Sequence, residues 1–179
     1  MTVKEISQVA DLSSPALALV QENSTHSDYL DSLEKKELYK DAIRFLAFKM
    51  EVNAGVKWGC KCIRELQPPE KKSEKDEPLE ASEQWVKTPG DPTRWAAKEA
   101  AGKPNVRGAS KMLAMAVFFS GGSIAPPQAP ETPPPPNLAQ KMIASSVDVN
   151  VLSHEPAKAT ERYKRSLALA KEAEQPAKA

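Results

Sequence analysis

The chain of 179 residues has little of what most catalytic and membrane-bound classes of protein require. It contains two histidines and two cysteines, and its 25 Lys and Arg residues nearly balance its 24 Asp and Glu residues. Because this balance leaves no overall field to attract an anionic polymer or surface, we expect no nucleic-acid partner and no membrane partner. The longest apolar run, residues 112–119, is far shorter than the ~20 residues that a transmembrane helix needs.

The amino-terminal segment also lacks the features of a secretory signal. It carries Glu5 and Asp11 and has no basic stretch followed by an apolar run. We therefore expect a cytoplasmic protein. The length suits one domain with a hydrophobic core of its own.

The two thiols, Cys60 and Cys62, are poorly spaced for a disulfide or a metal site. A disulfide between them would be strained, and a zinc site would need the distant His26 and His154, because the C-x₂-C spacing is absent. We expect two reduced thiols, with Cys60 buried as a small apolar group, and neither a metal nor a cofactor.

Patterns typical of β-strands are almost missing, apart from a brief alternation of valines within 147–151. Apolar residues recur at helical spacing instead, and Pro or Gly residues end the segments. This pattern predicts an all-α fold of about eight short helices, stacked as successive antiparallel hairpins with one proline-rich loop. The predicted helices lie at about 14–21, as a pair over 28–50, at 52–66, 79–86, 91–102 and 105–119, and from 138 and 155 onward.

Composition divides the chain into three parts. We expect residues 1–24 to form an amino-terminal segment with one short helix and loose order, residues 25–174 to form a single helical domain, and residues 175–179 to form a tail. Within the domain, residues 68–78 are predicted to be a charged, exposed loop and residues 121–137 a proline-rich loop. The last helix before the proline-rich loop is apolar most of the way round, which is typical of a central helix.

The stretch FFSGGSIAPP, residues 118–127, looks like a phosphate-binding loop but lies at the wrong end of a helix. Phosphate-binding glycines precede a helix, where N–H groups face the anion, whereas these glycines follow one. We expect Gly121 to take the left-handed conformation that caps a helix carboxyl terminus. The alternative is a small serine hydrolase with Ser120 or Ser123 as nucleophile, which would need one of the two histidines as a base.

Three tryptophans lie on helical segments beside small or apolar residues. Large aromatic side chains are usually buried in a core, but tryptophan and arginine are also enriched at protein interfaces, and Arg94 adjoins Trp95. Both interpretations stay open. Under the second, the tryptophans and the proline-rich loop form a partner-binding surface whose candidate residues are Trp58, Trp85, Arg94, Trp95, Pro126, Pro127, Pro133 and Pro134.

Several short motifs follow one another along the chain, and their order is more specific than any one of them. They are Asp41-Ala42 with Phe45-Leu46-Ala47, Trp58-x-Cys60-x-Cys62, Trp85-Val86-x-x-Pro89, Arg94 with Ala96-Ala97, and Ser120-Gly121-Gly122-Ser123-x-Ala125-Pro126-Pro127. In these motifs, over about residues 25–170, the chain resembles an uncharacterised bacterial family known only as a domain of unknown function. The resemblance implies a gene setting near type VI secretion, alongside spike-tip and effector-loading proteins, and it implies no catalytic residues. The chain departs from the family pattern at Gly59 and in the long charged loop.

We therefore expect a non-catalytic accessory protein, adaptor or chaperone-like protein that holds a protein partner through the candidate surface. The resemblance points to a secretion spike or effector as this partner. Two alternatives stay open, namely the serine hydrolase and a structural protomer of a larger assembly.

Overall fold

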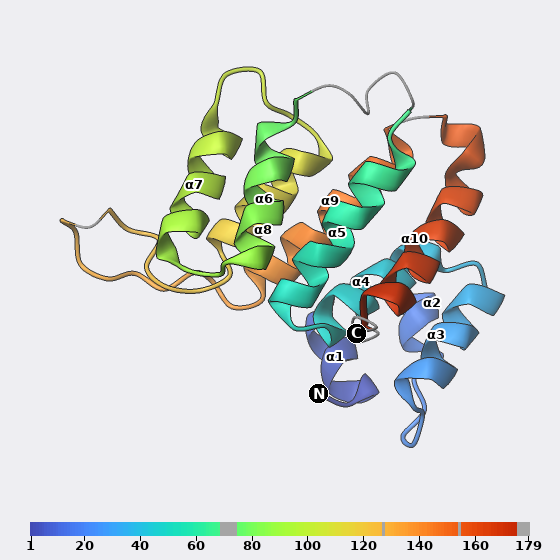
Figure 1. Cartoon of the computed structure of the whole chain (residues 1–179). Helices are drawn as coiled ribbons and strands as arrows, with labels where there is room; N and C mark the ends of the chain where they lie inside the picture. Colours follow the sequence, from blue (N-terminus) through green and yellow to red (C-terminus); the bar gives the residue numbers. More distant parts are fainter. Residues whose placement is uncertain (69–74, 127, 154, 175–179) are drawn as a thin grey trace, which may run out of the picture.

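The structure, a computed structural model, describes residues 1–68, 75–126, 128–153 and 155–174. In these residues the chain forms ten α-helices and one short 3₁₀ helix, η2, and no strand (Figure 1). The all-α prediction is confirmed, with ten helices in place of about eight. The elements are α1 Val3–Val9, α2 Ser14–Leu17, α3 His26–Lys35, α4 Tyr39–Lys49, α5 Val52–Leu66, α6 Glu77–Lys87, α7 Asp91–Gly102, α8 Ala109–Phe118, α9 Leu138–Leu152, η2 Pro156–Lys158 and α10 Ala159–Glu174.

The amino-terminal segment contains two helices where one was expected. Thr2 and Glu5 form a capping box at the start of α1, in which each side chain accepts a hydrogen bond from the other residue's N–H. Ile6 on α1 and Ala16 on α2 are fully buried. Both helices therefore contribute to the hydrophobic core.

Hydrogen bonds between buried groups fix this segment to α3 and α4. Ser13 caps α2, and its hydroxyl oxygen accepts a hydrogen bond from the N–H of Ala16. The buried carboxylate of Asp41 on α4 accepts hydrogen bonds from the N–H of Ser13, at 2.7 Å, and from its hydroxyl, at 2.9 Å. The hydroxyl of Tyr29 on α3 donates to the carbonyl oxygen of Ala16 at 2.8 Å. These contacts replace the water that the buried polar groups lose on folding.

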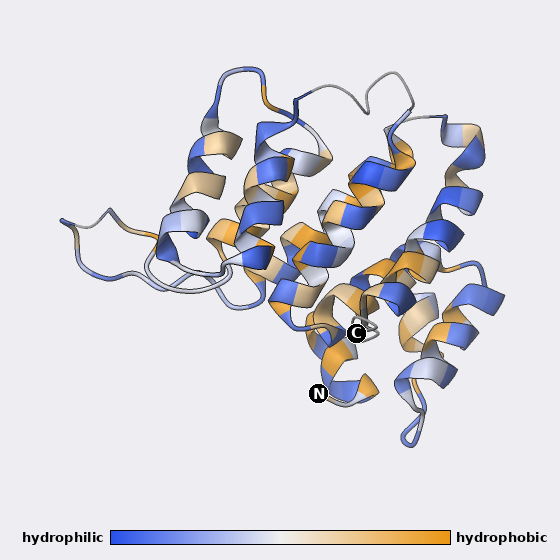
Figure 2. Cartoon of the chain, viewed as in Figure 1, coloured by the Kyte–Doolittle hydropathy of each residue, from blue (hydrophilic) through white to orange (hydrophobic). Residues whose placement is uncertain are grey.

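Helices α8 and α9 lie at the centre of the assembly. Helix α9 packs against α4, α5, α8 and α10, and α8 packs against α5, α6, α7 and α9. The central position predicted for α8 from its apolar surface is confirmed. Figure 2 shows apolar residues along α4, α8 and α9, whereas the visible side of α10 is mostly polar. Helices that are neighbours in sequence pack side by side at α6–α7, α7–α8 and α8–α9.

Helix α5 approaches this centre closely because it carries glycine at two contact points. A Cβ atom at Gly59 would lie 2.6 Å from Cδ1 of Leu113 on α8, and one at Gly55 would lie 3.0 Å from Cδ1 of Ile143 on α9. Both contacts would be tighter than Cβ atoms normally make. Trp58, between the two glycines in sequence, is fully buried, and its indole N–H donates to a carbonyl oxygen of α10 at 2.8 Å. Gly59, which the resemblance suggested as a departure from the family pattern, thus lies where the packing leaves little room for a side chain.

Both thiols are free and buried, which confirms the expectation for Cys60. Burial raises the pKa of Cys60 above its ordinary value and raises the pKa of Cys62 to about 12. Both groups are therefore neutral thiols at physiological pH, and neither has the thiolate character of a reactive cysteine.

Two predicted boundaries differ from the structure. Helix α8 begins at Ala109, later than the predicted start at 105, because Asn105 has a positive φ and lies in a turn before the helix. Helix α6 begins inside the predicted 68–78 loop, capped by the side chain of Asp76. The middle of that loop, residues 69–74, and the predicted tail, residues 175–179, lie outside the described residues.

Candidate functional site

The FFSGGS stretch shapes the chain where α8 ends. Phe119 is the C-cap of α8, and its N–H bonds back to the carbonyl oxygen of Met115. The left-handed residue is Gly122, with φ of +62°, so the prediction that Gly121 takes this conformation is wrong. Position 122 also needs glycine because of a tertiary contact, since a Cβ atom there would lie 2.8 Å from Nη2 of Arg94 on α7.

Arg94, on α7, is an internal anchor for this turn. Its side chain is only 3% exposed, and its guanidinium donates three hydrogen bonds. They run from Nε to Asp91 Oδ1 at 3.0 Å, from Nη1 to the carbonyl oxygen of Phe118 at 2.9 Å, and from Nη2 to that of Ser123 at 2.9 Å. The guanidinium also lies over the ring of Phe118, 5.3 Å from its centroid. Arg94 was predicted to contact a partner, but its donors are engaged within the chain.

Two hydrogen bonds, one between backbone groups and one to the side chain of Ser123, close the proline-rich loop at its base. The N–H of Ile124 donates to the carbonyl oxygen of Thr132 at 2.8 Å. The N–H of Thr132 donates to the hydroxyl oxygen of Ser123 at 3.1 Å, and the same oxygen accepts the N–H of Ala125 at 3.1 Å. Residues 124–126 and 128–132 therefore belong to a lobe with adjoining ends, which projects beyond α7 (Figure 1).

Three of the four prolines of the predicted surface are described, and they lie within this lobe or directly after it. Pro126 and Pro133 are exposed and Pro134 is half-buried, while Pro127 lies outside the described residues. The two prolines that follow are also exposed. The loop thus presents a short proline run next to the closed lobe.

The three tryptophans do not form the common surface that was hypothesised. Trp58 is fully buried and Trp85 is 6% exposed, so both are core residues. Trp95 alone is partly exposed. Its ring meets that of Phe118 edge to face at 5.1 Å, and the ammonium group of Lys98 lies 4.4 Å from its centroid. Beside it the surface of α7 is hollowed by an open cavity of about 640 Å³.

Ser123, one of the two serines considered for the hydrolase alternative, helps to hold the loop. The hydroxyl oxygen of Ser123 already accepts the two backbone hydrogen bonds described above. The Nε2 atom of His26 lies 3.0 Å from the carbonyl oxygen of Met1, and His154 lies outside the described residues. In the part of the chain that the structure describes, no group of three or more His, Cys, Asp or Glu side chains could hold a metal ion. None of the helices described is long and apolar enough to cross a membrane.

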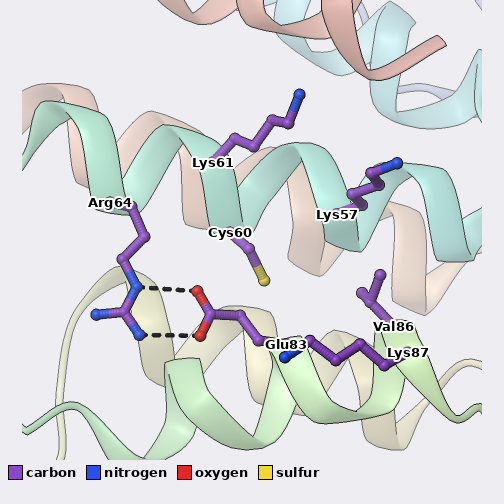
Figure 3. Close-up of a pocket in the computed structure, with 7 residues that line it drawn as sticks. All are labelled: Lys57, Cys60, Lys61, Arg64, Glu83, Val86 and Lys87. Carbon is purple, nitrogen blue, oxygen red and sulfur yellow. Dashed lines mark hydrogen bonds and ion pairs between the residues drawn. The ribbon is translucent and has the colours of Figure 1, made fainter. Parts of the chain in front are cut away.

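A second hollow, of about 450 Å³, lies between α5 and α6 (Figure 3). It was not predicted from the sequence. Lys57 and Lys61, which line it from α5, are four residues apart, and that spacing places both on one helix face. The sequence carries this basic face, but it does not show which helix packs against it.

A comparison with known protein families finds a match for the chain. The match spans residues 29–173, from α3 to the end of α10. The chain belongs to DUF6931, a family of unknown function. The expected resemblance to an uncharacterised family is confirmed. The DUF6931 region contains Arg94 and the whole proline-rich loop, whereas α1 and α2 precede it. No curated protein and no solved structure matches the chain.

Proposed function

We propose that this DUF6931 protein is a non-catalytic accessory protein that holds a protein partner on its proline-rich loop and the adjoining face of α7. The observation that supports the proposal is the combination of exposed prolines with an internally anchored loop base. The prolines around 133–136 are largely solvent-exposed, and Arg94 and Ser123 fix the segment from which they extend.

Conformational entropy gives this arrangement its value for binding. Ordering one backbone residue costs about 1–2 kcal/mol, so a flexible loop loses affinity when it docks. Proline has a fixed φ and favours the extended polyproline conformation before any partner arrives. A partner with an aromatic-lined groove could bind such a segment with little further ordering.

The α7 face extends the same surface. Trp95 and Lys98 present a partly exposed aromatic ring and a cation next to the open cavity on this helix. An aromatic ring with one exposed face is typical of residues that contribute strongly to protein interfaces. On the resemblance described above, a type VI secretion spike or effector, bound in the cytoplasm, is the partner to test first.

Co-purification from the native host, with a variant of the loop, tests the proposal. The substitutions Pro133→Ser, Pro135→Ser and Pro136→Ser, made together, remove the proline run and leave the anchor intact. The matched control carries Gln128→Ser, Ala129→Ser and Glu131→Ser in the same loop. We expect one protein to be recovered with the wild-type chain and the control, and at least tenfold less of it with the proline variant.

Equal recovery with the proline variant would contradict the role of the proline run. Recovery of no stable partner, together with unchanged secretion in a deletion strain, would remove the proposal. A mass in light scattering that rises with the concentration of the purified chain would favour the structural protomer instead.

A further inference from the structure

The cleft between α5 and α6 combines an apolar floor with a cationic rim. Its floor is formed by Val86 and by Cys60, whose thiol points from α5 toward α6 (Figure 3). Lys57 and Lys61 line it from α5, and Lys87 lines it from α6. The volume of about 450 Å³ lies within the range of small-molecule sites, roughly 300–1,000 Å³.

One end of the cleft is closed by an ion pair that engages Glu83, the one carboxylate among the described residues that line it. The guanidinium of Arg64 donates two hydrogen bonds to Glu83, from Nε to Oε1 and from Nη2 to Oε2, both at 2.9 Å. This pairing also raises the pKa of Arg64, which therefore stays charged. Both carboxylate oxygens of Glu83 are thus neutralised within the wall.

The three lysines remain uncompensated. Among the residues that the structure describes, none of them has an ion-pair partner. In Figure 3 the ammonium group of Lys87 lies along α6, whereas those of Lys57 and Lys61 extend from α5 away from α6. The flexible stems of lysine let these groups turn over the opening. Like charges around one hollow repel one another, so an anion bound among them would be favoured.

The floor limits what such an anion can be. The thiol of Cys60 is neutral because burial raises its pKa, and with Val86 it offers an apolar surface without a charge. A fully hydrated inorganic ion would leave this surface unused. We propose that the α5–α6 cleft binds a small organic anion, a carboxylate that carries a short apolar group, with the apolar group on the floor and the carboxylate among the lysines. This site is separate from the proposed partner surface on α7 and the loop.

Methyl NMR on the whole chain, following the methyl signals of Val86, tests the site at constant ionic strength. The probes are sodium hexanoate, 1-hexanol and sodium sulfate. We expect hexanoate to shift the signals saturably at a concentration at least tenfold lower than hexanol, and sulfate to leave them in place. This comparison uses the unaltered protein and does not depend on any variant folding.

Two variants then test whether the three lysines of the cleft bind the carboxylate. In one, Lys57→Gln, Lys61→Gln and Lys87→Gln remove the rim cations. In the control, Lys4→Gln, Lys36→Gln and Lys111→Gln remove the same charge from exposed positions elsewhere. We expect the first to weaken hexanoate binding at least fivefold and the second to weaken it less than twofold.

The proposal is overturned by any of four results. Hexanoate that shifts nothing shows that there is no site. Equal response to hexanoate and hexanol shows an apolar hollow without preference for anions, and an equal response to sulfate shows an ion site that does not use the floor. Equal weakening in the two variants shows an effect of net charge alone.

Discussion

Asp148 gives the sharpest test of the energetics of this fold, because its carboxyl group is buried where ionisation is unfavourable. It lies on α9 and is 8% exposed. Its Oδ1 accepts a hydrogen bond of 3.3 Å from the hydroxyl of Tyr163 on α10. Burial raises the pKa of Asp148 from 3.8 to about 6, although the cations of Lys40 and Arg44 and the Tyr163 hydrogen bond act in the opposite direction.

The sign of the pH dependence follows from this raised pKa. The folded chain holds the Asp148 proton more tightly than the unfolded chain, so the contribution to stability is full below pH 3.8 and is lost as the pH rises through about 6. A tenfold change in proton affinity corresponds to about 1.4 kcal/mol, so the whole effect is about 3 kcal/mol. About half of it, roughly 1.4 kcal/mol, is lost between pH 5 and pH 8.

The substitution Asp148→Asn replaces the ionising group with a neutral one of the same shape, whose oxygen can still accept from Tyr163. We expect the variant to be more stable than the wild type by about 3 kcal/mol at pH 8 and by about 1.5 kcal/mol at pH 5. Urea denaturation followed by far-UV circular dichroism measures both values. The control Asp31→Asn removes an exposed carboxylate and corrects for the loss of one negative charge.

Comparison of the variant with the wild type is essential because other carboxyl groups act in the opposite sense. Hydrogen bonds from Thr2 and Thr25 lower the pKa of Glu5 and Asp28, whose contributions are lost as the pH falls. These groups are unchanged in the variant, so their effect cancels. If Asp148→Asn were less stable than the wild type at pH 8, the ionised carboxylate would be a stabilising partner of the α4 cations and the reasoning would fail.

Three further predictions concern the glycines and the loop anchor. Gly122→Ala should lower the free energy of unfolding by about 2 kcal/mol, because residue 122 has a left-handed φ and lies against Arg94. Gly121→Ala, with open space around it, should change the free energy of unfolding by less than about 0.5 kcal/mol, and equal effects of the two variants would show that the turn does not depend on the contact with Arg94. Arg94→Lys should lower the free energy of unfolding by about 2 kcal/mol, because charge-assisted hydrogen bonds are lost, and should speed amide hydrogen exchange at the base of the loop. Unchanged exchange would show that Arg94 does not anchor the loop. Gly59→Ala should destabilise the protein by about 1 kcal/mol, because the added methyl group overpacks against α8, whereas Gly102→Ala, at the open end of α7, should stabilise it by about 0.5 kcal/mol. Thermal melts should therefore show a lower melting temperature for the first variant and a higher one for the second.

Local patterns in the sequence were enough to predict most of the fold. The apolar spacing, and prolines such as Pro68, indicated helices close to their observed positions from α3 onward. Helix α1 was missed although its signal is present, since Thr2 and Glu5 have the spacing of a capping box. This error could have been avoided with the sequence alone.

The remaining differences depend on contacts between distant segments. The space at Gly122 is limited by Arg94, which lies on another helix, so the local sequence does not show which of the two neighbouring glycines has the left-handed conformation. The same holds for the cleft, since Lys57 and Lys87 come together only through the packing of α5 on α6. The residue spacing on one helix shows which side chains share a face of that helix, but the cleft also depends on the helix that packs against it.

The closed base of the proline-rich loop affects how readily the loop can change in length. The two sides of the loop meet where the N–H of Ile124 bonds to the carbonyl oxygen of Thr132, so the two ends of the intervening segment lie next to each other. Residues could be added to or removed from the tip without moving α9 away from α8, because the cost of lengthening a closed loop grows only slowly. The tip can thus change in length and sequence while Arg94 holds the base of the loop in place.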